Sequence, residues 1–424
     1  MSEHPRIAIV DGRRTPFIRA GGALASLAPL ELGSVVVRHL VEEHGLDQVP
    51  PDRLAVVWGT SLSYARELYG GREIAIDVGL PAVTGHATEF ACATSVKTAV
   101  EGALMLMAGE HDVVIAGGSE SLSHQPLHLS REAERLARLR RDRHPEQFAE
   151  QLLELTLQDL LPRVPAIAEP YSGQTLAYYA ETMMGEWGVS RADADHYAAQ
   201  SHQRAGAARE QIAPRLLPVD APGGTVDADD LVRPETTPEI LADLPMVHPE
   251  LGGGVSPGNA SRLTDGAGGV VLSTEQWAAE RGVRPQGWIR GWALTAHDPD
   301  EGVLLGPAHA IPAVLDRSGL RLGDIDVVEL HEAFAGQVLA NLAALGDRGF
   351  AQKRLGRDTA VGAIAPDEIN AWGGSIPLGH PFGATGARLI TQTLDRLEAE
   401  DGHLGLLALC VGGTRGAAMI VERA

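Results

Sequence analysis

Cysteine is scarce in this chain: only Cys92 and Cys410 occur among its 424 residues. Two unpaired thiols fit a reducing compartment, so we expect a cytoplasmic protein. No positively charged segment followed by an apolar run begins the sequence, and its apolar runs are shorter than a membrane span. We therefore expect neither a secretion signal nor a transmembrane segment.

Positive charge is scarce as well. The sequence has 35 Lys and Arg residues against 56 Asp and Glu residues, a formal net charge of -21, and Lys97 and Lys353 are its only lysines. A nucleic-acid-binding surface needs a basic stripe that neutralises phosphates, so a nucleic-acid partner is not expected. A phosphorylated small ligand stays compatible with this charge, because it needs only a local site.

Motifs that hold metals or nucleotides are absent from the sequence. Its two cysteines and 16 histidines form no Cys-x-x-Cys and no His-Glu-x-x-His spacing, so no zinc site is expected. No Gly-x-x-x-x-Gly-Lys-Ser/Thr run occurs either, which excludes a nucleotide-hydrolysing motor. We predict no metal and no tightly held cofactor.

Helices and strands alternate in the same order near both ends of the chain. Hydrophobic residues make up 44% of the sequence, enough for the cores of two or three domains. The pattern predicts, in the first copy, a helix over 30–43, a strand over 54–58, a helix over 95–108 and a strand over 113–116, and in the second copy a helix over 310–318, a strand over 325–330, a helix over 386–397 and a strand over 404–410. This repeated order predicts two similar α/β halves that face each other.

Three side chains of chemical interest occupy turns beside these elements. Cys92 and His380 each precede a predicted helix, and Cys410 ends a predicted strand just before two glycines. Ligands of open α/β sheets gather at strand ends and helix starts, and unpaired backbone N–H groups there favour a thiolate. A packed thiol or a turn histidine would explain each residue taken alone. The three together predict a catalytic set in a cleft between the halves.

The region between the two halves has a different composition. It contains an arginine-rich stretch over 131–143, an apolar helical pattern at Phe148, Leu152, Leu155 and Leu160, and two helices over 175–186 and 191–208. A glycine-rich run then leads to a strand over 269–273. We predict an N-terminal half over 1–127 that is completed by 252–282, a loop domain over 128–251 that covers the active site, and a C-terminal half over 283–424.

The stretch from Arg131 to Pro162 leaves two interpretations open. Its arginines stand out in an acidic chain and its leucines can line one helical face, so it could dock an acidic partner subunit or an anionic membrane. Charged side chains on a helix are more often simply its solvated face, with the leucines packed on the domain beneath. Under that second interpretation the stretch is only a lid.

Six motifs, spread over the whole chain, follow the order found in one enzyme family. They are the turn around Cys92, Gly-Gly-Ser-Glu-Ser-Leu-Ser at 117–123, Gly-Asn-Ala-Ser with Thr-Asp-Gly-Ala within 258–267, His-Glu-Ala-Phe at 331–334, Gly-Gly-Ser-Ile-Pro-Leu-Gly-His-Pro-Phe-Gly-Ala-Thr-Gly at 373–386, and Cys-Val-Gly-Gly at 410–413. On these motifs the chain resembles the thiolases, which are acetyl-CoA C-acyltransferases. His331 departs from the commonest pattern, which has Asn there, and resembles the branch of fatty-acid oxidation trifunctional complex β-subunits.

The resemblance implies a thiolase fold of the α/β class, with two similar layered αβαβα halves and an inserted loop domain. It implies cleavage of 3-oxoacyl-CoA by CoA to acetyl-CoA and a shortened acyl-CoA in fatty-acid β-oxidation, a part of lipid metabolism, or the reverse Claisen condensation. Coenzyme A would then be substrate and product, with acyl-CoA as the other ligand. The resemblance also implies a homodimer or tetramer and raises a hydratase/dehydrogenase partner subunit.

The resemblance assigns roles residue by residue. Cys92 matches the nucleophile that forms an acyl-enzyme, and His380 matches the histidine that accepts the thiol proton. Cys410 matches the second thiol, which moves the α-proton of acetyl-CoA. The backbone N–H groups of Cys92 and Gly412 would bind the acyl-enzyme oxyanion. His380 and a water held by His331 would bind the enolate oxygen.

Two further positions match residues that contact CoA in the family, Ser261 and Arg233. Each has a plain structural explanation as well, since Ser261 could cap a loop and Arg233 could be a surface residue.

Two alternative functions stay open at this point. A ketosynthase or a 3-hydroxy-3-methylglutaryl-CoA synthase also uses a nucleophilic cysteine, but lacks the second thiol that Cys410 supplies. A non-catalytic thiolase-like subunit of a complex would not need Cys92, His380 and Cys410, all of which are present.

Overall fold

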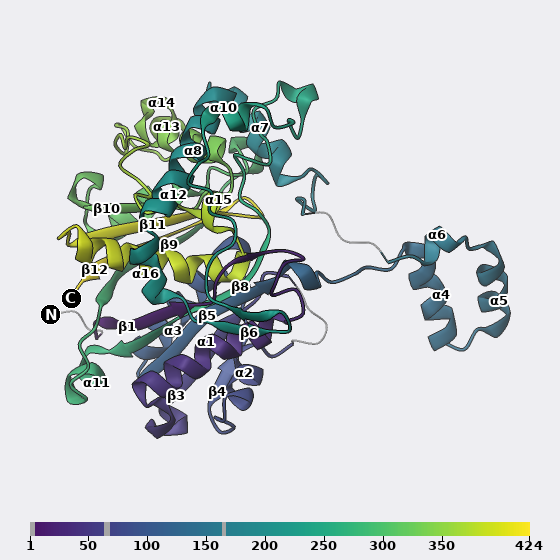
Figure 1. Ribbon diagram of the computed structural model, residues 1–424, viewed down its shortest axis with the longest axis horizontal. Helices are drawn as coiled ribbons and strands as arrows, with labels where there is room; N and C mark the ends of the chain where they lie inside the picture. The colour runs from purple at the N-terminus through teal and green to yellow at the C-terminus, as the bar shows by residue number, and fades with distance from the viewer. Residues whose placement is uncertain (1–4, 63–67, 163–166) are drawn as a thin grey trace.

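A ten-stranded mixed sheet runs through the main body of the molecule (Figure 1). The computed structural model describes residues 5–62, 68–162 and 167–424. The strands of this sheet are β1 (Ile7–Arg14), β2 (Ile18–Arg19), β3 (Leu54–Gly59), β4 (Thr84–His86), β5 (Val113–Ser121), β8 (Thr264–Thr274), β9 (Gly287–Ala296), β10 (Val327–Leu330), β11 (Leu404–Val411) and β12 (Arg415–Arg423). Their order is β10-β11-β12-β9-β1-β8-β5-β3-β4, with β2 beside β8, while β6 (Val219–Ala221) and β7 (Gly224–Val226) form a separate hairpin.

The two halves of the sheet have the same pairing pattern. In the first half β3 is parallel to β5, β5 is antiparallel to β8, and β8 is antiparallel to β1. In the second half β10 is parallel to β11, β11 is antiparallel to β12, and β12 is antiparallel to β9. Pairing of β1 with β9 joins the halves. The predicted internal repeat of two similar α/β halves is therefore confirmed.

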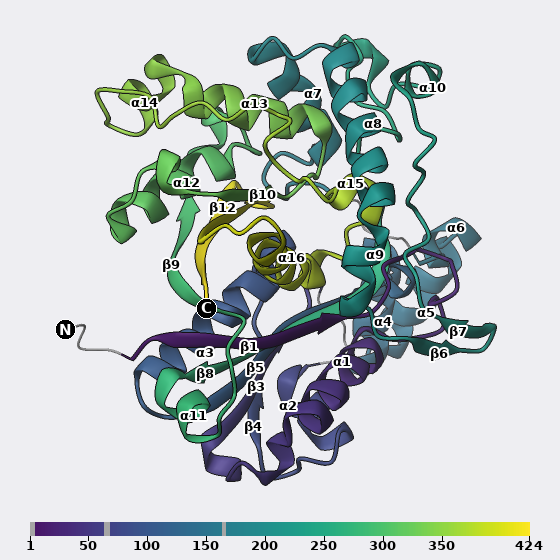
Figure 2. The ribbon, with the colours of Figure 1, turned by 60° about the vertical axis from the view of Figure 1, so that its left-hand side comes forward.

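Helices cover the outer faces of both halves and fill the space between them. On the outside lie α1 (Pro29–His44) and α2 (Gly71–Asp77) in the first half, and α12 (Gly306–Ser318), α13 (Ala335–Gly346) and α14 (Arg348–Arg354) in the second. In the middle, α3 (Thr94–Met107) and α16 (Thr385–Ala399) contact each other and strands of the sheet on either side. Figure 2 shows α16 end-on between the two halves. This gives the αβαβα layering that the resemblance implies.

Small residues allow the two middle helices to meet where they begin. A Cβ atom on Gly386 would lie 2.8 Å from the backbone nitrogen of Val96, so only glycine fits there. The backbone N–H of Ala387 donates to the hydroxyl of Ser95 over 2.8 Å. The starts of α3 and α16, one from each half, are therefore held against each other.

The region inserted between the halves consists of two unlike parts. The first, α4 (Arg131–Arg141), α5 (Pro145–Glu154) and α6 (Leu157–Leu160), projects from the body as an arm (Figure 1). The second, α7 (Leu176–Glu186), α8 (Arg191–Ala207), α9 (Arg209–Ile212) and α10 (Pro238–Ala242), lies on the second half, where α7 and α8 contact α13. Two short helices complete the chain, α11 (Glu275–Glu280) and α15 (Ser375–Leu378). The boundaries predicted for the loop domain stay a prediction.

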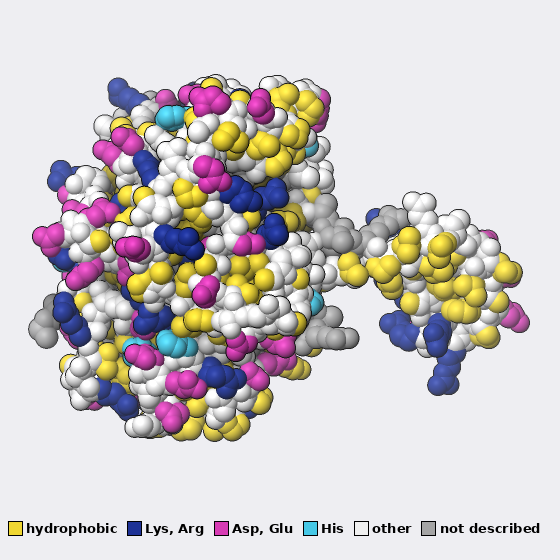
Figure 3. All heavy atoms as spheres, in the orientation of Figure 1, with side chains coloured by type: hydrophobic (Ala, Val, Ile, Leu, Met, Phe, Trp, Pro, Cys, Tyr) yellow, Lys and Arg dark blue, Asp and Glu magenta, His cyan; other side chains and the backbone are white. Residues whose placement is uncertain are grey.

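The arm corrects one sequence-based expectation. The apolar pattern from Phe148 to Leu160 predicts one helix, but α5 ends at Glu154 and α6 begins at Leu157. Leu155 has an extended backbone, and Thr156 starts α6 with a capping box, which explains the break. Figure 3 shows hydrophobic side chains gathered on the arm beside a group of arginines.

Candidate active site

Cys92, His331 and His380 come together between the two halves. Cys92 lies in a short turn (Ala91–Ala93) before α3, and His380 lies just before the turn (Phe382–Ala384) that begins α16. These turns contact each other. The sulfur of Cys92 and a ring nitrogen of each histidine lie within 4.8 Å of one another, and all three residues are buried. The structure thus joins three of the residues that the sequence singles out.

The turn that holds Cys92 is tightly constrained. Ala91 has a φ of 41°, in the left-handed region that residues other than glycine rarely adopt. The hydroxyl of Ser61 donates to the Ala91 carbonyl over 2.7 Å, and the hydroxyl of Thr94 donates to the same oxygen over 2.8 Å. These bonds hold the backbone in a conformation that presents the Cys92 sulfur at the start of α3.

The sulfur of Cys92 faces two backbone amides. Burial raises the pKa of Cys92 to about 11, against the opposing effect of the backbone N–H groups of Gly412 and of Cys92 itself. The resting group is therefore a neutral thiol. Two converging N–H groups beside a nucleophile form the geometry of an oxyanion hole, and they are the two that the resemblance assigns.

His380 is a neutral imidazole with one ring nitrogen held by a hydroxyl. Its Nδ1 lies 2.6 Å from the hydroxyl oxygen of Thr385. Burial, with a further effect of the Arg388 charge, lowers the pKa of His380 to about 3. Its Nε2 has no hydrogen-bond partner within the described ranges. This nitrogen is free to exchange a proton with a reacting group.

His331 lies beside His380, directly after β10. The ring centroids of the two histidines are 4.1 Å apart. The Nδ1 of His331 lies 2.8 Å from the hydroxyl of Ser375, and among the described residues its Nε2 has no partner. Burial, then the neighbouring His380 and Arg388, lower the pKa of His331 well below its usual value. Both imidazoles are therefore uncharged at neutral pH.

A buried carboxylate anchors the segments around His331. Glu332 accepts hydrogen bonds from the hydroxyl of Tyr197 over 2.9 Å, from the amide of Asn370 over 2.7 Å and from the backbone N–H of Ile376 over 3.0 Å. Its carboxylate is fully buried, and these donors offset the cost of removing it from water. The network fixes the start of α15 relative to β10.

Cys410 lies close to Cys92 but deeper in the structure. It is 1% exposed on β11, opposite Gly416 of β12. Burial raises its pKa well above the usual value, and any negative charge on Cys92 would raise it further. Cys410 does not line the cavity beside Cys92.

An apolar cavity of about 410 Å³ opens beside Cys92. Its walls include Leu62, Ile167, Leu176 and Phe382, with Gly412 next to the sulfur. The segment that contributes Ile167 and Leu176 belongs to the inserted region, whereas no residue of the α4–α6 arm lines this cavity. The part of the inserted region that approaches the site therefore begins after the arm.

Two charged side chains meet the loop that follows Cys410. Glu169, 2% exposed, accepts the backbone N–H of Gly413 over 2.8 Å. Arg415 donates from its Nε to the Gly412 carbonyl over 2.8 Å. Together they fix the loop that carries the Gly412 amide. Thr414, between them, has a φ of 57°, which is strained for a β-branched residue.

The two CoA-contact candidates lie apart from the apolar cavity. The backbone N–H of Ser261 donates to the Ala333 carbonyl over 2.9 Å, which places Ser261 beside the turn of His331. The backbone N–H of Arg233 donates to Nδ1 of His202 over 3.2 Å. Neither residue lines the cavity at Cys92, and their role in CoA binding stays a prediction.

The remaining family motifs hold the two halves together. Glu120, in the motif at 117–123, accepts the N–H of Ser61 over 2.8 Å and that of Gly383 over 3.3 Å. It thereby joins the first half to the turn that begins α16. Asn259, in Gly-Asn-Ala-Ser, accepts the N–H of Ser256 over 2.8 Å and donates to Asp195 over 2.8 Å.

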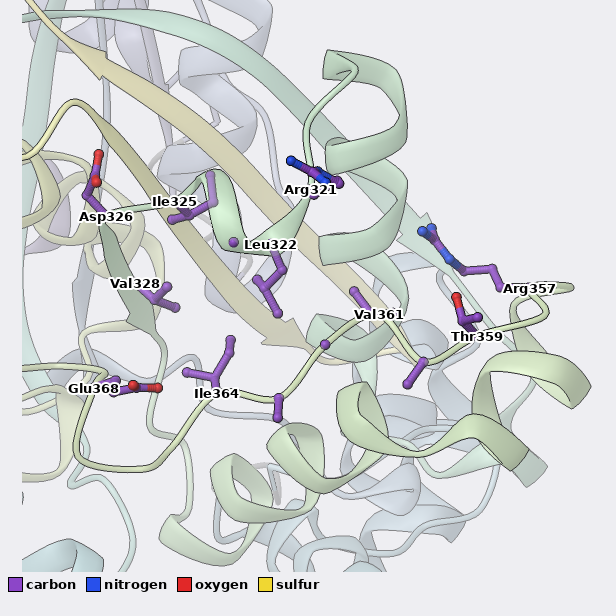
Figure 4. A pocket seen from close by; sticks show the side chains of 14 residues that line it. Arg321, Leu322, Ile325, Asp326, Val328, Arg357, Thr359, Val361, Ile364 and Glu368 are labelled. Atoms are coloured by element: carbon purple, nitrogen blue, oxygen red, sulfur yellow. The ribbon is translucent and has the colours of Figure 1, made fainter.

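A larger cavity, of about 560 Å³, lies elsewhere in the second half (Figure 4). Its arginines already have partners: Arg357 pairs with Asp316 over 2.8 Å, and Arg321 pairs with Asp324 over 3.5 Å. None of the described residues that line it carries a thiol or an imidazole. Size alone therefore does not identify the reactive site.

Among the described residues, Cys92, His331 and His380 are also the group whose ligand atoms lie close enough to hold a metal ion. The same atoms are the nucleophile and the proton-transfer groups of the site. The expectation that no metal takes part stays a prediction.

Sequence reasoning missed the residues that support the site. Ser375 and Thr385 lie inside the motif at 373–386, where their hydroxyl groups next to histidines in space could have drawn attention. Arg388 follows two residues after that motif, and Arg415 follows the second cysteine motif. Glu169 carries no sequence signal, because its partner Gly413 is distant along the chain.

Comparison with known proteins places this geometry in a family. The model described as "Thiolase, N-terminal domain" matches residues 7–276, and "Thiolase, C-terminal domain" matches residues 283–423. The chain is 40% identical to the 3-ketoacyl-CoA thiolase of Colwellia psychrerythraea, over 98% of this chain and 97% of the relative. It is 35% identical to the mitochondrial trifunctional enzyme subunit beta of Macaca fascicularis, over 98% of this chain and 88% of the relative.

Solved structures share the fold. The human mitochondrial 3-ketoacyl-CoA thiolase has a TM-score of 0.81 at 26% identity, and the match covers 99% of both chains. The acetyl-CoA acetyltransferase of Bacillus anthracis has a TM-score of 0.84 at 27% identity, again over 99% of both chains.

Proposed function

The chain belongs to the thiolase family, and we propose that it cleaves 3-oxoacyl-CoA with CoA to acetyl-CoA and a shortened acyl-CoA, or runs the reverse Claisen condensation. The observation that carries this proposal is the convergence of a buried thiol, two neutral imidazoles and two backbone amides. Such a set supplies a nucleophile, a proton acceptor and donors to an oxyanion.

In the first half of the reaction, His380 takes the proton of the Cys92 thiol while the sulfur attacks carbon 3 of the substrate. The resulting alkoxide is stabilised by the N–H groups of Cys92 and Gly412. The bond between carbons 2 and 3 then breaks, which leaves an acyl group on Cys92 and the enolate of acetyl-CoA. The enolate oxygen faces His331 and His380, and Cys410 gives its proton to carbon 2.

In the second half, free CoA replaces acetyl-CoA. Its thiol gives a proton to the Cys410 thiolate, and its sulfur attacks the acyl group on Cys92. The same two amides stabilise the new alkoxide, after which the Cys92 sulfur leaves and regains its proton from His380. The products are the shortened acyl-CoA and the starting enzyme, so every proton is accounted for.

The test is a rate assay with a series of 3-oxoacyl-CoA chain lengths and CoA, with condensation of acetyl-CoA measured alongside. Thiolysis that is lost in Cys92→Ser supports the proposal. Condensation without any thiolysis would favour a ketosynthase-like or synthase-like enzyme. Absence of both reactions in a folded wild-type protein would favour a non-catalytic subunit.

We also propose a cytoplasmic homodimer or tetramer, with CoA as substrate and product and no other cofactor. Among the described residues, no helix combines the length and the apolar character that crossing a membrane requires. Light scattering on the purified protein would determine the number of copies, and fractionation of cells that express it would determine its compartment.

We propose that the α4–α6 arm binds a partner subunit. The arm exposes large apolar side chains, with Leu153 88% and Leu157 77% exposed, and it also carries the exposed Arg138 and Arg141. Figure 3 shows hydrophobic and basic side chains gathered on it. These arginines stand out in a chain whose net charge is -21, and they favour an acidic protein surface as the partner. We propose a hydratase/dehydrogenase subunit as this partner, and the likeness to a relative named as the beta subunit of a trifunctional enzyme supports association with another subunit.

Replacement of Arg138, Arg140 and Arg141 by Ala tests this partner. We expect thiolysis to be unchanged and co-purification with the hydratase/dehydrogenase subunit at low salt to be lost. The matched control replaces Arg281, Arg284 and Arg321, three exposed arginines on the body, and should keep the association. Binding to anionic vesicles without any subunit association would assign the arm to a membrane instead. If the wild type associates neither with the subunit nor with vesicles, the proposal is contradicted.

A further inference from the structure

Arg388 is a buried arginine directly behind the reactive histidines. It is 2% exposed on α16, and burial lowers its pKa to about 10. One guanidinium nitrogen donates to the hydroxyl oxygen of Ser375 over 2.9 Å, and another donates to the amide oxygen of Gln392 over 3.2 Å. A buried charge needs such partners, and here one partner also touches the site.

Ser375 connects this arginine to His331. Its hydroxyl oxygen lies 2.9 Å from the guanidinium of Arg388 and 2.8 Å from Nδ1 of His331. A guanidinium has only donors, so the oxygen of Ser375 must accept from Arg388. The single hydroxyl proton then has one acceptor among the described residues, the Nδ1 of His331. If Nδ1 carried a proton instead, a buried hydroxyl would lose its acceptor, which is costly.

We propose that Arg388 and Ser375 are positioning residues that keep His331 in the neutral form with its proton on Nε2. This nitrogen points to the shared space of Cys92 and His380, where no described residue pairs with it. His331 is therefore a permanent hydrogen-bond donor toward the enolate oxygen. The inference rests on the proposed function and deepens it, because an oxyanion needs a donor and a histidine of undetermined form could equally present an acceptor.

His380 differs from His331 in the hydrogen bonding of its Nδ1. That nitrogen faces the hydroxyl of Thr385 over 2.6 Å, and no described guanidinium donates to this hydroxyl. Thr385 can therefore donate to or accept from His380, which lets His380 take up and return a proton. The two neighbouring imidazoles therefore have separate roles: His331 is fixed as a hydrogen-bond donor, and His380 is free to gain and lose a proton.

The first test determines which ring nitrogen of His331 carries the proton. It is made on the wild type, so its result does not depend on whether a variant folds. Protein labelled with ¹⁵N-histidine is examined by long-range ¹H–¹⁵N correlation at neutral pH, and the His331 signals are found by their absence in His331→Asn. We expect a protonated Nε2 and an unprotonated Nδ1. A protonated Nδ1 would overturn the inference, whatever the enzyme's activity.

The second test separates the two oxyanion sites. Exchange of the α-hydrogens of acetyl-CoA with deuterated solvent requires the enolate site, whereas acylation of Cys92 requires the amides of Cys92 and Gly412. We expect Ser375→Ala and Arg388→Met to slow the exchange by about tenfold to a hundredfold, while acylation by acyl-CoA stays within about twofold. Arg388→Lys keeps a charged donor and should restore part of the exchange rate.

Arg396→Met is the matched control. Arg396 is also 2% exposed on α16, but its guanidinium pairs with Glu329 and Glu400, each over 2.8 Å, and not with Ser375. Its loss should lower the melting temperature without changing the ratio of exchange to acylation. An equal fall of both rates in Ser375→Ala and Arg388→Met would reduce these residues to a structural role and overturn the inference. A wild type that neither exchanges nor acylates would instead contradict the proposed function.

Discussion

The imidazole rings of His331 and His380 lie 4.1 Å apart, with an angle of 46° between their planes. Burial, then the charges of a protonated His380 and of Arg388, lower the pKa of His331, and burial, then the Arg388 charge, lower the pKa of His380. The pair is therefore uncharged in the resting enzyme. Negative charge that develops on a substrate oxygen between the rings and Cys92 meets a site that burial keeps from water, where hydrogen bonds to an oxyanion are strongest.

Removal of the nucleophile is expected to abolish turnover. Cys92→Ser should lower the thiolysis rate by several orders of magnitude, because a serine hydroxyl is a much weaker nucleophile in this setting. Mass spectrometry of the wild type after mixing with acyl-CoA should find the acyl group on the peptide that contains Cys92. An adduct confined to the peptide of Cys410 would reverse the assignment.

The two thiols are expected to have separable roles. Cys410→Ala should still become acylated at Cys92, yet fail to exchange the α-hydrogens of acetyl-CoA with deuterated solvent. The substitution removes a single buried sulfur atom, so the void is small and the melting temperature should fall only modestly. Undiminished exchange would remove Cys410 from proton transfer.

Glu169 is expected to support the oxyanion hole through the backbone. Its carboxylate holds the N–H of Gly413, next to the amide that faces the Cys92 sulfur. Glu169→Ala should lower the acylation rate by about tenfold, a part of what loss of a whole oxyanion donor costs. Glu169→Gln keeps an acceptor and should stay close to the wild type.

Glu275 provides the control for this prediction. It lies at the start of α11 and pairs with Arg6 over 3.8 Å, but its side chain is 51% exposed, and such pairs contribute little. Glu275→Ala should therefore leave acylation unchanged. A similar loss in both variants would show that the loss of a negative charge in general matters, rather than the loss of the bond to Gly413.

The stability of the protein is expected to fall on mild acidification. Burial lowers the pKa of His202 to about 4, below its usual value of about 6.5. Below pH 6.5 the unfolded chain binds a proton that the folded chain does not, so stability present above that pH is lost between about 6.5 and about 4. His309, with a pKa lowered to about 4, adds to the same slope.

Denaturant unfolding at several pH values measures this effect. Replacement of His202 by Gln should flatten the dependence by at most about 1.4 kcal/mol per pH unit within that window. Replacement of the exposed His403, whose side chain is 66% exposed, should not change it. An identical slope in the wild type and His202→Gln would contradict the depressed pKa.

Local patterns predict the elements that repeat. The helix expected over 30–43 is α1 (Pro29–His44), and the strand expected over 54–58 is β3 (Leu54–Gly59). The strands β1, β9 and β12 were not predicted, because their identity depends on partners far away in the sequence. β1, for example, pairs with β8 and β9, which follow it by more than half of the chain.

The residues of the site also fall into those that the sequence predicts and those that it does not. Cys92 and His380 lie in turns that the sequence marks, so their meeting follows from the repeat. Ser375 and Arg388 matter only through a hydrogen bond of 2.9 Å between them and one of 2.8 Å from Ser375 to His331. Such distances depend on side-chain conformations, which the hydrophobic periodicity of the sequence does not predict.

At Gly386 the start of α16 lies against the start of α3, so the reactive centre forms at the interface between the two halves. The nucleophile begins α3 in one half and His380 precedes α16 in the other, while the link after β8 passes through the exposed Arg281 and Gly282. A chain cut at this link would give two pieces, each with its own sheet and neither with a complete centre. Reactivity would then rise with the concentration of the second piece, as for the subunits of a dimer.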